Sequence, residues 1–431
     1  MAQLSDDRQR RAGTDRAAAF DALETRSPKQ READAMAALV RQLAHAKAHT
    51  RWFADALRDV EPNEIRTRAD LARLPLLRKG DLTELQQRDP PFGGLVATPT
   101  AELARLYCSP GPIHVPEGRT GDWWRAARAL HAAGFRRGDL VANTFNHHFT
   151  PAAGMMESGG RALACVMLPT GVGQPEAQAA FFARVRAAGF VGTPSFLKQV
   201  VEHAEASGLE LASLRKALVT GEYLPESLRN WALARGIEVS QCYAVAEIGL
   251  IAYEERGAGG TVAPGMVLDE SILVEIVRPG TGEPMPPGEV GELVVTTFNT
   301  DYPLIRFATG DLFALQPPGE RGHRTNERIG NWRGRADQST KVRGVFVHPA
   351  QVAEIMRRHA EVRRAQFKVG TDEGGDDLRL ACEVAAPSAQ LSQALVATVR
   401  ALTKLRCSVE LVAPGTLPND GIVIDDTRKY G

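Results

Sequence analysis

The sequence predicts an α/β protein of two domains, in which a large doubly wound sheet precedes a smaller α+β domain. The chain has 431 residues, more than the roughly 250–300 that one hydrophobic core usually serves. From residue 139 onward short apolar runs alternate with helical segments, and past residue 257 the pattern changes to strands and tight turns. Alternating strands and helices predict parallel strands joined by crossovers, with ligands at the carboxyl ends of the strands.

The composition is that of a globular protein without a charged partner of one sign. The 52 basic and 52 acidic residues give a formal net charge of zero, which argues against nucleic acid or an anionic membrane as a partner. The five cysteines are odd in number and show no C-x-x-C spacing, so we expect reduced core thiols. No apolar run approaches the ~18–20 residues that span a bilayer, and the N-terminus lacks an apolar leader. We therefore expect a soluble, cytoplasmic protein.

The N-terminal region is predicted to form a helical cap. Met36, Leu39, Val40 and Leu43 recur at the spacing of one helix face, which is the signature of an amphipathic helix. Residues 71–82 predict a turn followed by a new helix.

Short apolar runs predict the strands of the large sheet: 139–143, 163–168, 190–193, 217–220 and 237–240. Segments 176–187 and 225–235 suit the helices between them. Polar residues follow these strands at 143–148, 193–195, 221–222 and 241–243. Because ligands of doubly wound sheets bind at the carboxyl ends of strands, we look for the site in these segments.

The remaining chain predicts a small β-rich subdomain and then the second domain. Ile272–Val277 and Gly291–Thr297 read as strands. After residue 344 we expect two helices, with Val352, Ile355 and Met356 on one face of the first, and a strand at 378–384. The predicted domains are residues 1–336 and 337–431.

The segment Gly334–Gly344 lies at this boundary, where its two glycines bracket a run of Arg, Asp and Lys residues. Glycine adopts backbone angles that other residues avoid, and clefts between domains bind ligands. We interpret the segment as a hinge, although a solvated linker has the same composition.

Six segments in this order resemble the phenylacetate–coenzyme A ligase family of the adenylate-forming (AMP-binding) enzymes. They are 193–196, 220–225, 243–249, 291–297, 302–312 and the hinge segment extended to Pro349. Members of that family activate a carboxylic acid with Mg-ATP, release pyrophosphate and transfer the acyl group from AMP to coenzyme A. The resemblance implies ATP or AMP, Mg²⁺ and coenzyme A as cofactors.

The resemblance assigns catalytic and nucleotide-binding roles to four residues. Asp311 would accept hydrogen bonds from the ribose hydroxyls, or it merely stabilises a turn. Glu247 would help to hold Mg²⁺, or it is a solvated residue at a helix start. Arg335 would reach ribose or phosphate with its fork of donors, and Asp337 would be the pivot of domain rotation. A surface ion pair is the alternative for these last two.

Further residues would surround the nucleotide and the hinge. Gly221, Glu222, Gln241, Cys242 and Tyr243 would frame the adenine, and the Tyr243 ring either stacks on it or belongs to the core. Arg343 and Gly344 would lie beside the pivot and belong to the nucleotide-binding residues.

The acid is expected near Asn146–Phe149. His147 and His148 could bind a metal, but adjacent side chains in a strand point to opposite faces and no third ligand is visible. We therefore favour a histidine, assigned to His148, against the substrate carboxylate.

Three departures from the family pattern concern the ATP triphosphate. The segment 107–118 replaces a Ser/Thr/Gly-rich loop that carries a lysine, and its two prolines beside Gly111 remove N–H donors. Ile422 follows Leu417–Gly421 where relatives carry a catalytic lysine, and Ala246 replaces a hydroxyl residue. Losing a preorganised cation slows phosphoryl transfer, unless Lys429, Arg428 or a partner substitutes.

The predicted function is ATP-dependent activation of a small aromatic or hydrophobic carboxylic acid, with transfer to coenzyme A or another acceptor. The alternatives are a non-catalytic protein that binds a nucleotide or acyl-adenylate, and an acyltransferase that uses a preformed adenylate. The resemblance also makes a homodimer an expectation.

Overall fold

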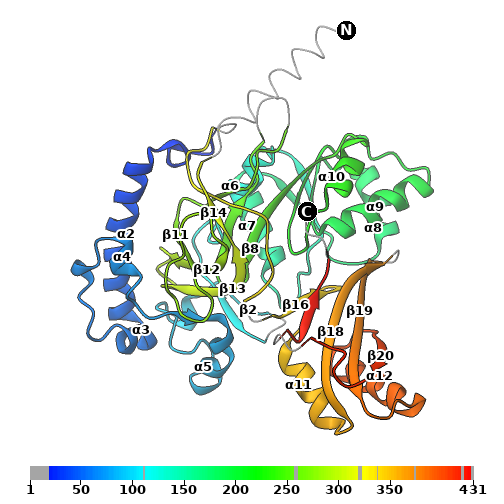
Figure 1. The fold of residues 1–431 in the computed structure, drawn as a ribbon. Coiled ribbons are helices and arrows are strands. Elements are labelled where there is room, and N and C mark those ends of the chain that lie inside the picture. Colours follow the sequence, from blue (N-terminus) through cyan, green and yellow to red (C-terminus); the bar gives the residue numbers. More distant parts are fainter. Residues whose placement is uncertain are drawn as a thin grey trace. The chain divides into compact units, whose positions relative to one another are not determined.

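The computed structural model of the chain describes residues 19–109, 112–256, 261–318, 323–336, 338–372, 375–418 and 422–428. The chain divides into two compact units (Figure 1). The first comprises Met1–Thr309 and Phe313–Asn331, and the second Gly310–Leu312 and Trp332–Gly431. The adenylation and mobile roles given to domains 1–336 and 337–431 stay predictions, and the proposed pivot Asp337 lies outside the described residues.

The first unit begins with helices, as predicted. Its N-terminal helices are α2 (Pro28–His49), α3 (Arg51–Ala56), α4 (Arg68–Leu71) and α5 (Leu82–Arg88). Ser27 caps α2 by accepting a hydrogen bond from the Gln30 amide, which satisfies one of the free donors at a helix start. Leu39 and Leu43 of the predicted apolar face are fully buried.

The main sheet of the first unit has the strand order β14-β15-β10-β9-β8-β7-β6-β4-β5. Its parallel strands are β4 (Leu140–Asn143), β5 (Val166–Pro169), β6 (Gly189–Gly192), β7 (Lys216–Val219) and β8 (Glu238–Val245). Antiparallel strands extend it on one side: β9 (Gly249–Tyr253), β10 (Met266–Leu268), β15 (Arg328–Ile329) and β14 (Leu315–Gln316). The β-rich subdomain expected past residue 257 therefore does not include β10, β14 and β15, which belong to the large sheet.

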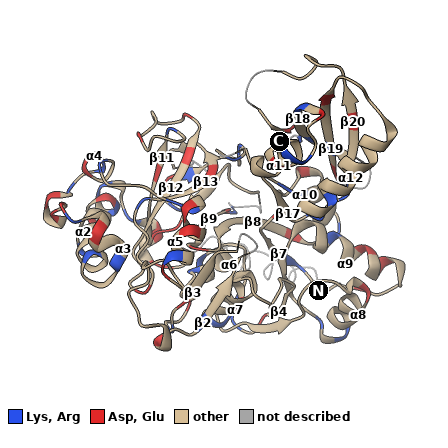
Figure 2. Cartoon of the chain, turned by 90° about the horizontal axis from the view of Figure 1, so that it is seen from below, with Lys and Arg blue, Asp and Glu red and all other residues tan. Residues whose placement is uncertain are grey.

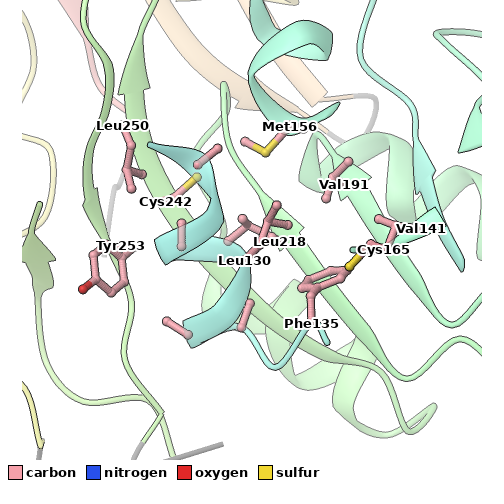
Figure 3. Close-up of a cluster of buried hydrophobic side chains, with 14 of the residues drawn as sticks. Leu130, Phe135, Val141, Met156, Cys165, Val191, Leu218, Cys242, Leu250 and Tyr253 are labelled. Atoms are coloured by element: carbon pink, nitrogen blue, oxygen red, sulfur yellow. The ribbon is translucent and has the colours of Figure 1, made fainter. Parts of the chain in front are cut away.

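Helices cover both faces of this sheet, which confirms the doubly wound fold. They are α6 (Ala126–Ala132), α7 (Ala152–Ala162), α8 (Pro175–Val185), α9 (Pro194–Ala206) and α10 (Glu226–Leu233). Val141 and Leu218 pack with α6 and α7 in one core (Figure 3). Ala142 and Val219, one position further on, pack with α8, α9 and α10 in another core. This alternation follows from the two-residue period of a strand that is buried on both faces.

The strand order reverses at β4, which lies between β5 and β6 in the sheet. The chain passes from β4 to its neighbour β5 and then crosses to β6 on the other side. Such a switch point is where open α/β sheets bind ligands. The predicted strand 163–168 begins only at Val166, because Leu163 caps α7 and donates its amide to the Gly159 carbonyl.

A second sheet has the order β1-β13-β12-β11 and belongs to the first unit except for Gly310–Leu312 of β13. Its strands are β1 (Leu77–Arg78), β11 (Ile272–Val277), β12 (Gly291–Thr297) and β13 (Phe307–Phe313). A separate hairpin pairs β2 (Arg105–Cys108) with β3 (His114–Glu117). The strands predicted at 272–277 and 291–297 are confirmed.

The second unit is the predicted α+β domain. A hairpin of β16 (Thr340–Val342) and β17 (Val345–Val347) precedes α11 (Pro349–Arg358) and α12 (Ala389–Thr403). Its sheet has the order β20-β19-β18-β21. The strands are β18 (Val362–Asp372), β19 (Gly375–Val384), β20 (Ser408–Val412) and β21 (Ile424–Asp426). The long strand β18 had no counterpart in the prediction.

The charged side chains and the cysteines are distributed as the composition predicts. Basic and acidic residues are interspersed along helices such as α2 and α9 (Figure 2). The five cysteines are free, and Cys165, Cys242 and Cys382 are buried. Among the helices of the described ranges, none combines the length and apolar character that crossing a membrane requires.

Candidate active site

Glu247 lies in the turn that joins β8 to β9, rather than at the solvated helix start considered as an alternative. Val245 and Gly249 pair across this turn, and the Ile248 amide donates to the Val245 carbonyl at 3.2 Å. Only 2% of Glu247 is exposed. Its Oε2 lies 3.0 Å from Nζ of Lys79, and its buried Oε1 has no hydrogen-bond partner in the described part of the chain.

Tyr302 is a second buried polar group near this carboxylate. Its hydroxyl is buried without a partner among the described residues. Burial, with a smaller contribution from the Glu247 charge, raises the pKa of Tyr302 well above its ordinary value. Because buried polar atoms are almost always hydrogen-bonded, two orphaned oxygens in one neighbourhood mark a place where a ligand can supply partners.

The Oε1 oxygen of Glu247, which has no partner among the described residues, could take part in binding a magnesium ion that is shared with a bound phosphate. Mg²⁺ is usually held by one or two carboxylates together with phosphate oxygens and water. Within the described residues no group of three His, Cys, Asp or Glu side chains could hold a metal alone. Glu247 Oε1 could therefore contribute one protein ligand, and a nucleotide would have to provide others.

Lys79 is a candidate site residue that sequence reasoning missed. It follows strand β1, which pairs with β13, and its side chain keeps 27% of its surface exposed beside the buried carboxylate. In the sequence, Lys79 belongs to no motif and lies only before an expected helix start. Its partner is 168 positions away, so only the fold reveals a cation at this place.

The unusual loop at 107–118 forms the β2–β3 hairpin. Cys108 pairs with His114, the Ser109 amide donates to the Ile113 carbonyl, and the Ile113 amide donates to Oγ of Ser109. The loop's hydroxyl is therefore engaged within the loop itself. Pro110 and Gly111 lie outside the described residues.

The segment after β4 lies beside this hairpin, because the Cys108 amide donates to the Phe149 carbonyl at 2.8 Å. Phe149 has a left-handed φ of 62° and is 79% exposed. His148 is also exposed. The inward histidine is His147, whose Nε2 is buried without a partner in the described ranges. The prediction had assigned the substrate contact to His148.

The residues proposed to frame the adenine follow β7 and lie along β8. Gly221 has a left-handed φ of 83°, and Oε2 of Glu222 accepts a hydrogen bond from the Ser195 amide at 3.3 Å. The Tyr243 ring lies 4.8 Å from the Phe313 ring. Gln241 precedes Cys242 on β8 and is only partly buried.

Cys242 differs from its neighbours because its side chain belongs to the core (Figure 3). It is 1% exposed, and burial raises the pKa of its thiol to about 12. Strand alternation places it opposite Gln241 and Tyr243. The thiol therefore has no access to a ligand, and only the backbone of Cys242 could contribute to a nucleotide site.

In the second unit, Asp311 is paired with Arg335. Oδ1 of Asp311 accepts from Nη1 of Arg335 at 3.1 Å and from the Trp332 indole at 3.2 Å. Gly310 has a φ of 80°, and a Cβ there would lie 2.5 Å from Nη2 of Arg335. Asp311 thus belongs to a strand and an ion pair rather than to a simple turn.

Arg343 and Gly344 form the turn of the β16–β17 hairpin. Both have positive φ, 48° and 82°, as tight hairpin turns require. The Arg343 amide donates to Oδ2 of Asp376, and its Nε donates to the Asp376 carbonyl.

The positions near the missing lysine are only partly described. Arg428 contacts Asp376 at 2.9 Å and donates to the Lys341 carbonyl, so its guanidinium is engaged with the hairpin. Ile422 is 44% exposed, whereas Lys429 lies outside the described residues.

Comparisons with known proteins agree with this architecture. Residues 144–300 match the family model of the AMP-binding enzyme. The chain is 31% identical to a phenylacetate–coenzyme A ligase of Aromatoleum evansii, over 78% of this chain and 77% of that protein. It is 32% identical to one of Thermus thermophilus, over 76% and 75% of the two chains.

A solved structure shows the same fold across both units. It is 2-hydroxyisobutyryl-CoA ligase in complex with 2-HIB-AMP and CoA, which aligns with a TM-score of 0.78 at 23% identity. The alignment covers 95% of this chain and 92% of that one. The fold and the family match together define an adenylate-forming enzyme. More particularly, the chain belongs to the phenylacetate–coenzyme A ligase family, a family of AMP-forming acid–thiol ligases that use ATP, Mg²⁺ and coenzyme A.

Proposed function

We propose that this ligase activates a small aromatic or hydrophobic carboxylic acid as its acyl-adenylate and then transfers the acyl group to coenzyme A. The observation that carries the proposal is the buried Glu247, which has Lys79 on one oxygen and no partner among the described residues on the other. A carboxylate in this state is suited to a metal ion that arrives with the nucleotide.

In the first half-reaction the substrate carboxylate attacks the α-phosphorus of ATP, and pyrophosphate leaves. Bound Mg²⁺ would neutralise phosphate charge in this step. Glu247 would hold the ion. Lys79, whose Nζ lies 3.0 Å from Glu247, would supply a positive charge to the phosphates, since the loop of 107–118 has no lysine. Asp311 and Arg335 would serve the ribose and phosphate of AMP, and Asp337 would be the pivot between the half-reactions.

The acid would bind at the switch point after β4. His147 presents a buried Nε2 that has no partner in the described part of the chain, and it suits a carboxylate ligand better than the exposed His148. Phe149 offers an apolar ring beside it. The names of the relatives support this substrate class, because phenylacetate is a small aromatic acid.

A second candidate is an acyltransferase that receives a preformed acyl-adenylate. Ile422 favours it, because an apolar side chain stands where relatives place the cation of the adenylation step. In that case thioester formation would proceed and pyrophosphate release would be slow.

Mass spectrometry of reaction mixtures separates the two candidates. The protein is incubated with coenzyme A and a panel of aromatic and aliphatic acids, once with Mg-ATP and once with the synthetic acyl-adenylates. Acyl-CoA and AMP from Mg-ATP support the ligase. Acyl-CoA from the adenylates alone supports the acyltransferase, and no acyl-CoA in either mixture contradicts both.

A further inference from the structure

The turn that precedes α6 makes direct contact with the turn that carries Glu247. Arg125 has a left-handed φ of 63°. Its Nη2 donates to the Ile248 carbonyl at 2.7 Å and to the Leu250 carbonyl at 3.0 Å. A left-handed backbone at a residue other than glycine is unfavourable and persists only where surrounding contacts enforce it. Here one guanidinium nitrogen bridges two carbonyls that flank Gly249.

The opposite side of Arg125 is anchored in the core. Its Nε lies 3.1 Å from Oδ1 of Asp269, whose side chain is fully buried. Oδ2 of Asp269 lies 3.3 Å from Nε of Arg128. Arg125 is therefore held between a buried carboxylate and the two carbonyls, so its planar group has a fixed direction.

Backbone contacts join the same two segments. The Leu250 amide donates to the Trp124 carbonyl at 3.1 Å. Gly249 has a φ of 86°, and a Cβ there would lie 2.8 Å from that carbonyl oxygen. The close approach thus requires glycine at 249, and it brings Ile248 and Leu250 within reach of the arginine.

Glu247 occupies the tip of this turn, where the β8–β9 ladder has ended. A turn tip has few ladder bonds to fix it, and a metal-binding carboxylate must be held within a fraction of an ångström. We propose that Arg125 is a positioning residue for Glu247: by clamping the carbonyls of Ile248 and Leu250, it fixes the direction of the carboxylate toward Mg²⁺. The inference rests on the proposed metal-binding role of Glu247.

The test compares Mn²⁺ affinity, measured by electron paramagnetic resonance with a non-hydrolysable ATP analogue, in the wild type, Arg125→Met and Arg125→Lys. Arg125→Met is expected to weaken Mn²⁺ binding by about tenfold or more, as loss of a supporting partner does in metal sites. Arg125→Lys should recover part of the loss, because its ammonium can still donate to the carbonyls. Metal-free AMP binding should be unchanged in all three proteins.

Arg136→Met is the matched control. Arg136 also donates from one nitrogen to two carbonyls, those of His131 and Phe135, but at the other end of α6. The Arg136→Met variant should have a lower melting temperature than the wild type and an unchanged Mn²⁺ affinity.

Three results overturn the inference. If Arg125→Met binds Mn²⁺ as tightly as the wild type, or if Arg136→Met weakens it equally, Arg125 does not position Glu247. If the wild type binds no Mn²⁺ with the nucleotide, the metal role of Glu247 fails and the inference fails with it. Acyl-CoA formation by the wild type then shows whether the proposed function survives.

Discussion

Nζ of Lys79 lies 3.0 Å from Oε2 of Glu247, and the carboxylate has no exposed surface while the lysine keeps 27% of its own. The partly exposed ammonium of Lys79 can turn toward an incoming phosphate, whereas the buried carboxylate of Glu247 stays in place. Lys79→Met should therefore slow adenylation by about 10²-fold, the order found when one preorganised donor to a transition state is removed.

Two comparisons make that prediction specific to Lys79. Thioester formation from a preformed acyl-adenylate should fall much less, because no pyrophosphate leaves in that step. Lys216→Met is the control, since Lys216 is a partly buried lysine paired with Asp139 at 2.7 Å. Equal losses in both variants, or in both half-reactions, would contradict the role of Lys79.

Gly310→Ala tests whether the Asp311–Arg335 pair serves the nucleotide. A Cβ at Gly310 would lie 2.5 Å from Nη2 of Arg335, so the guanidinium must move away from Asp311. Calorimetry should show AMP binding weakened by about tenfold, the loss of one charge-assisted contact of ~1.4 kcal/mol. Gly280→Ala has the same left-handed strain, φ 82°, but meets no atom within 4 Å. If AMP affinity falls equally in both variants, the Asp311–Arg335 pair does not serve the nucleotide.

Ile422→Lys tests the missing cation. Ile422 is 44% exposed, so a lysine fits there without burying its charge. If the departure from the family pattern limits adenylation, the variant should form acyl-adenylate faster by about tenfold or more. Quenched-flow measurement of pyrophosphate release gives the rate of adenylation. An unchanged or slower rate would mean that Lys79 or another cation already performs this role.

The raised pKa of the buried Asp122 should make the stability of the protein depend on pH. Burial raises the pKa of its carboxyl from 3.8 to about 7, opposed by the Ala127 amide and Arg125 and assisted by Asp269. Between these values the folded chain retains a proton that the unfolded chain has released. The contribution of Asp122 to the free energy of unfolding should therefore be most favourable at and below pH 3.8. It should fall as the pH rises toward 7.

Asp122→Asn carries no such proton, so it should remove this dependence. Thermal melts at about pH 5.5 and pH 8.5 measure it. The variant should gain melting temperature over the wild type at both pH values, and clearly more at the higher one, because the wild type loses stability throughout the interval between the two pKa values. The opposite order, or a constant difference, would show that Asp122 does not titrate in this way.

Much of the fold follows from local sequence pattern. Val141, Ala142, Leu218 and Val219 belong to short apolar runs between helical segments, and alternation along a buried strand explains their division between two cores. The antiparallel strands β9, β10 and β15 were not predicted as part of the large sheet, because strand pairing depends on contacts distant in sequence. The long strand β18 was missed for a different reason: it pairs with β19 directly after it in the chain, and its buried residues Ala365, Phe367 and Val369 alternate with polar ones, a local signal that the prediction did not use.

The candidate site residues that belong to sequence motifs were predicted from the sequence. Those brought to the site only by contacts distant in sequence were not. Glu247 and Asp311 were found through motifs, yet Glu247 lies in a hairpin turn and Asp311 in a strand. Lys79 and Arg125 had no motif, since each acts on residues more than a hundred positions away. Cys242 was placed beside the adenine by its position in a motif, whereas strand alternation sends its thiol into the core.

Isotope exchange between pyrophosphate and ATP, without coenzyme A, tests the central claim most directly. The wild type should catalyse exchange that depends on both Mg²⁺ and a small aromatic or hydrophobic acid, and Glu247→Gln should reduce it by about 10²-fold. Exchange that is absent with every acid, while acyl-adenylates are converted to acyl-CoA, would contradict the claim that this enzyme makes its own adenylate.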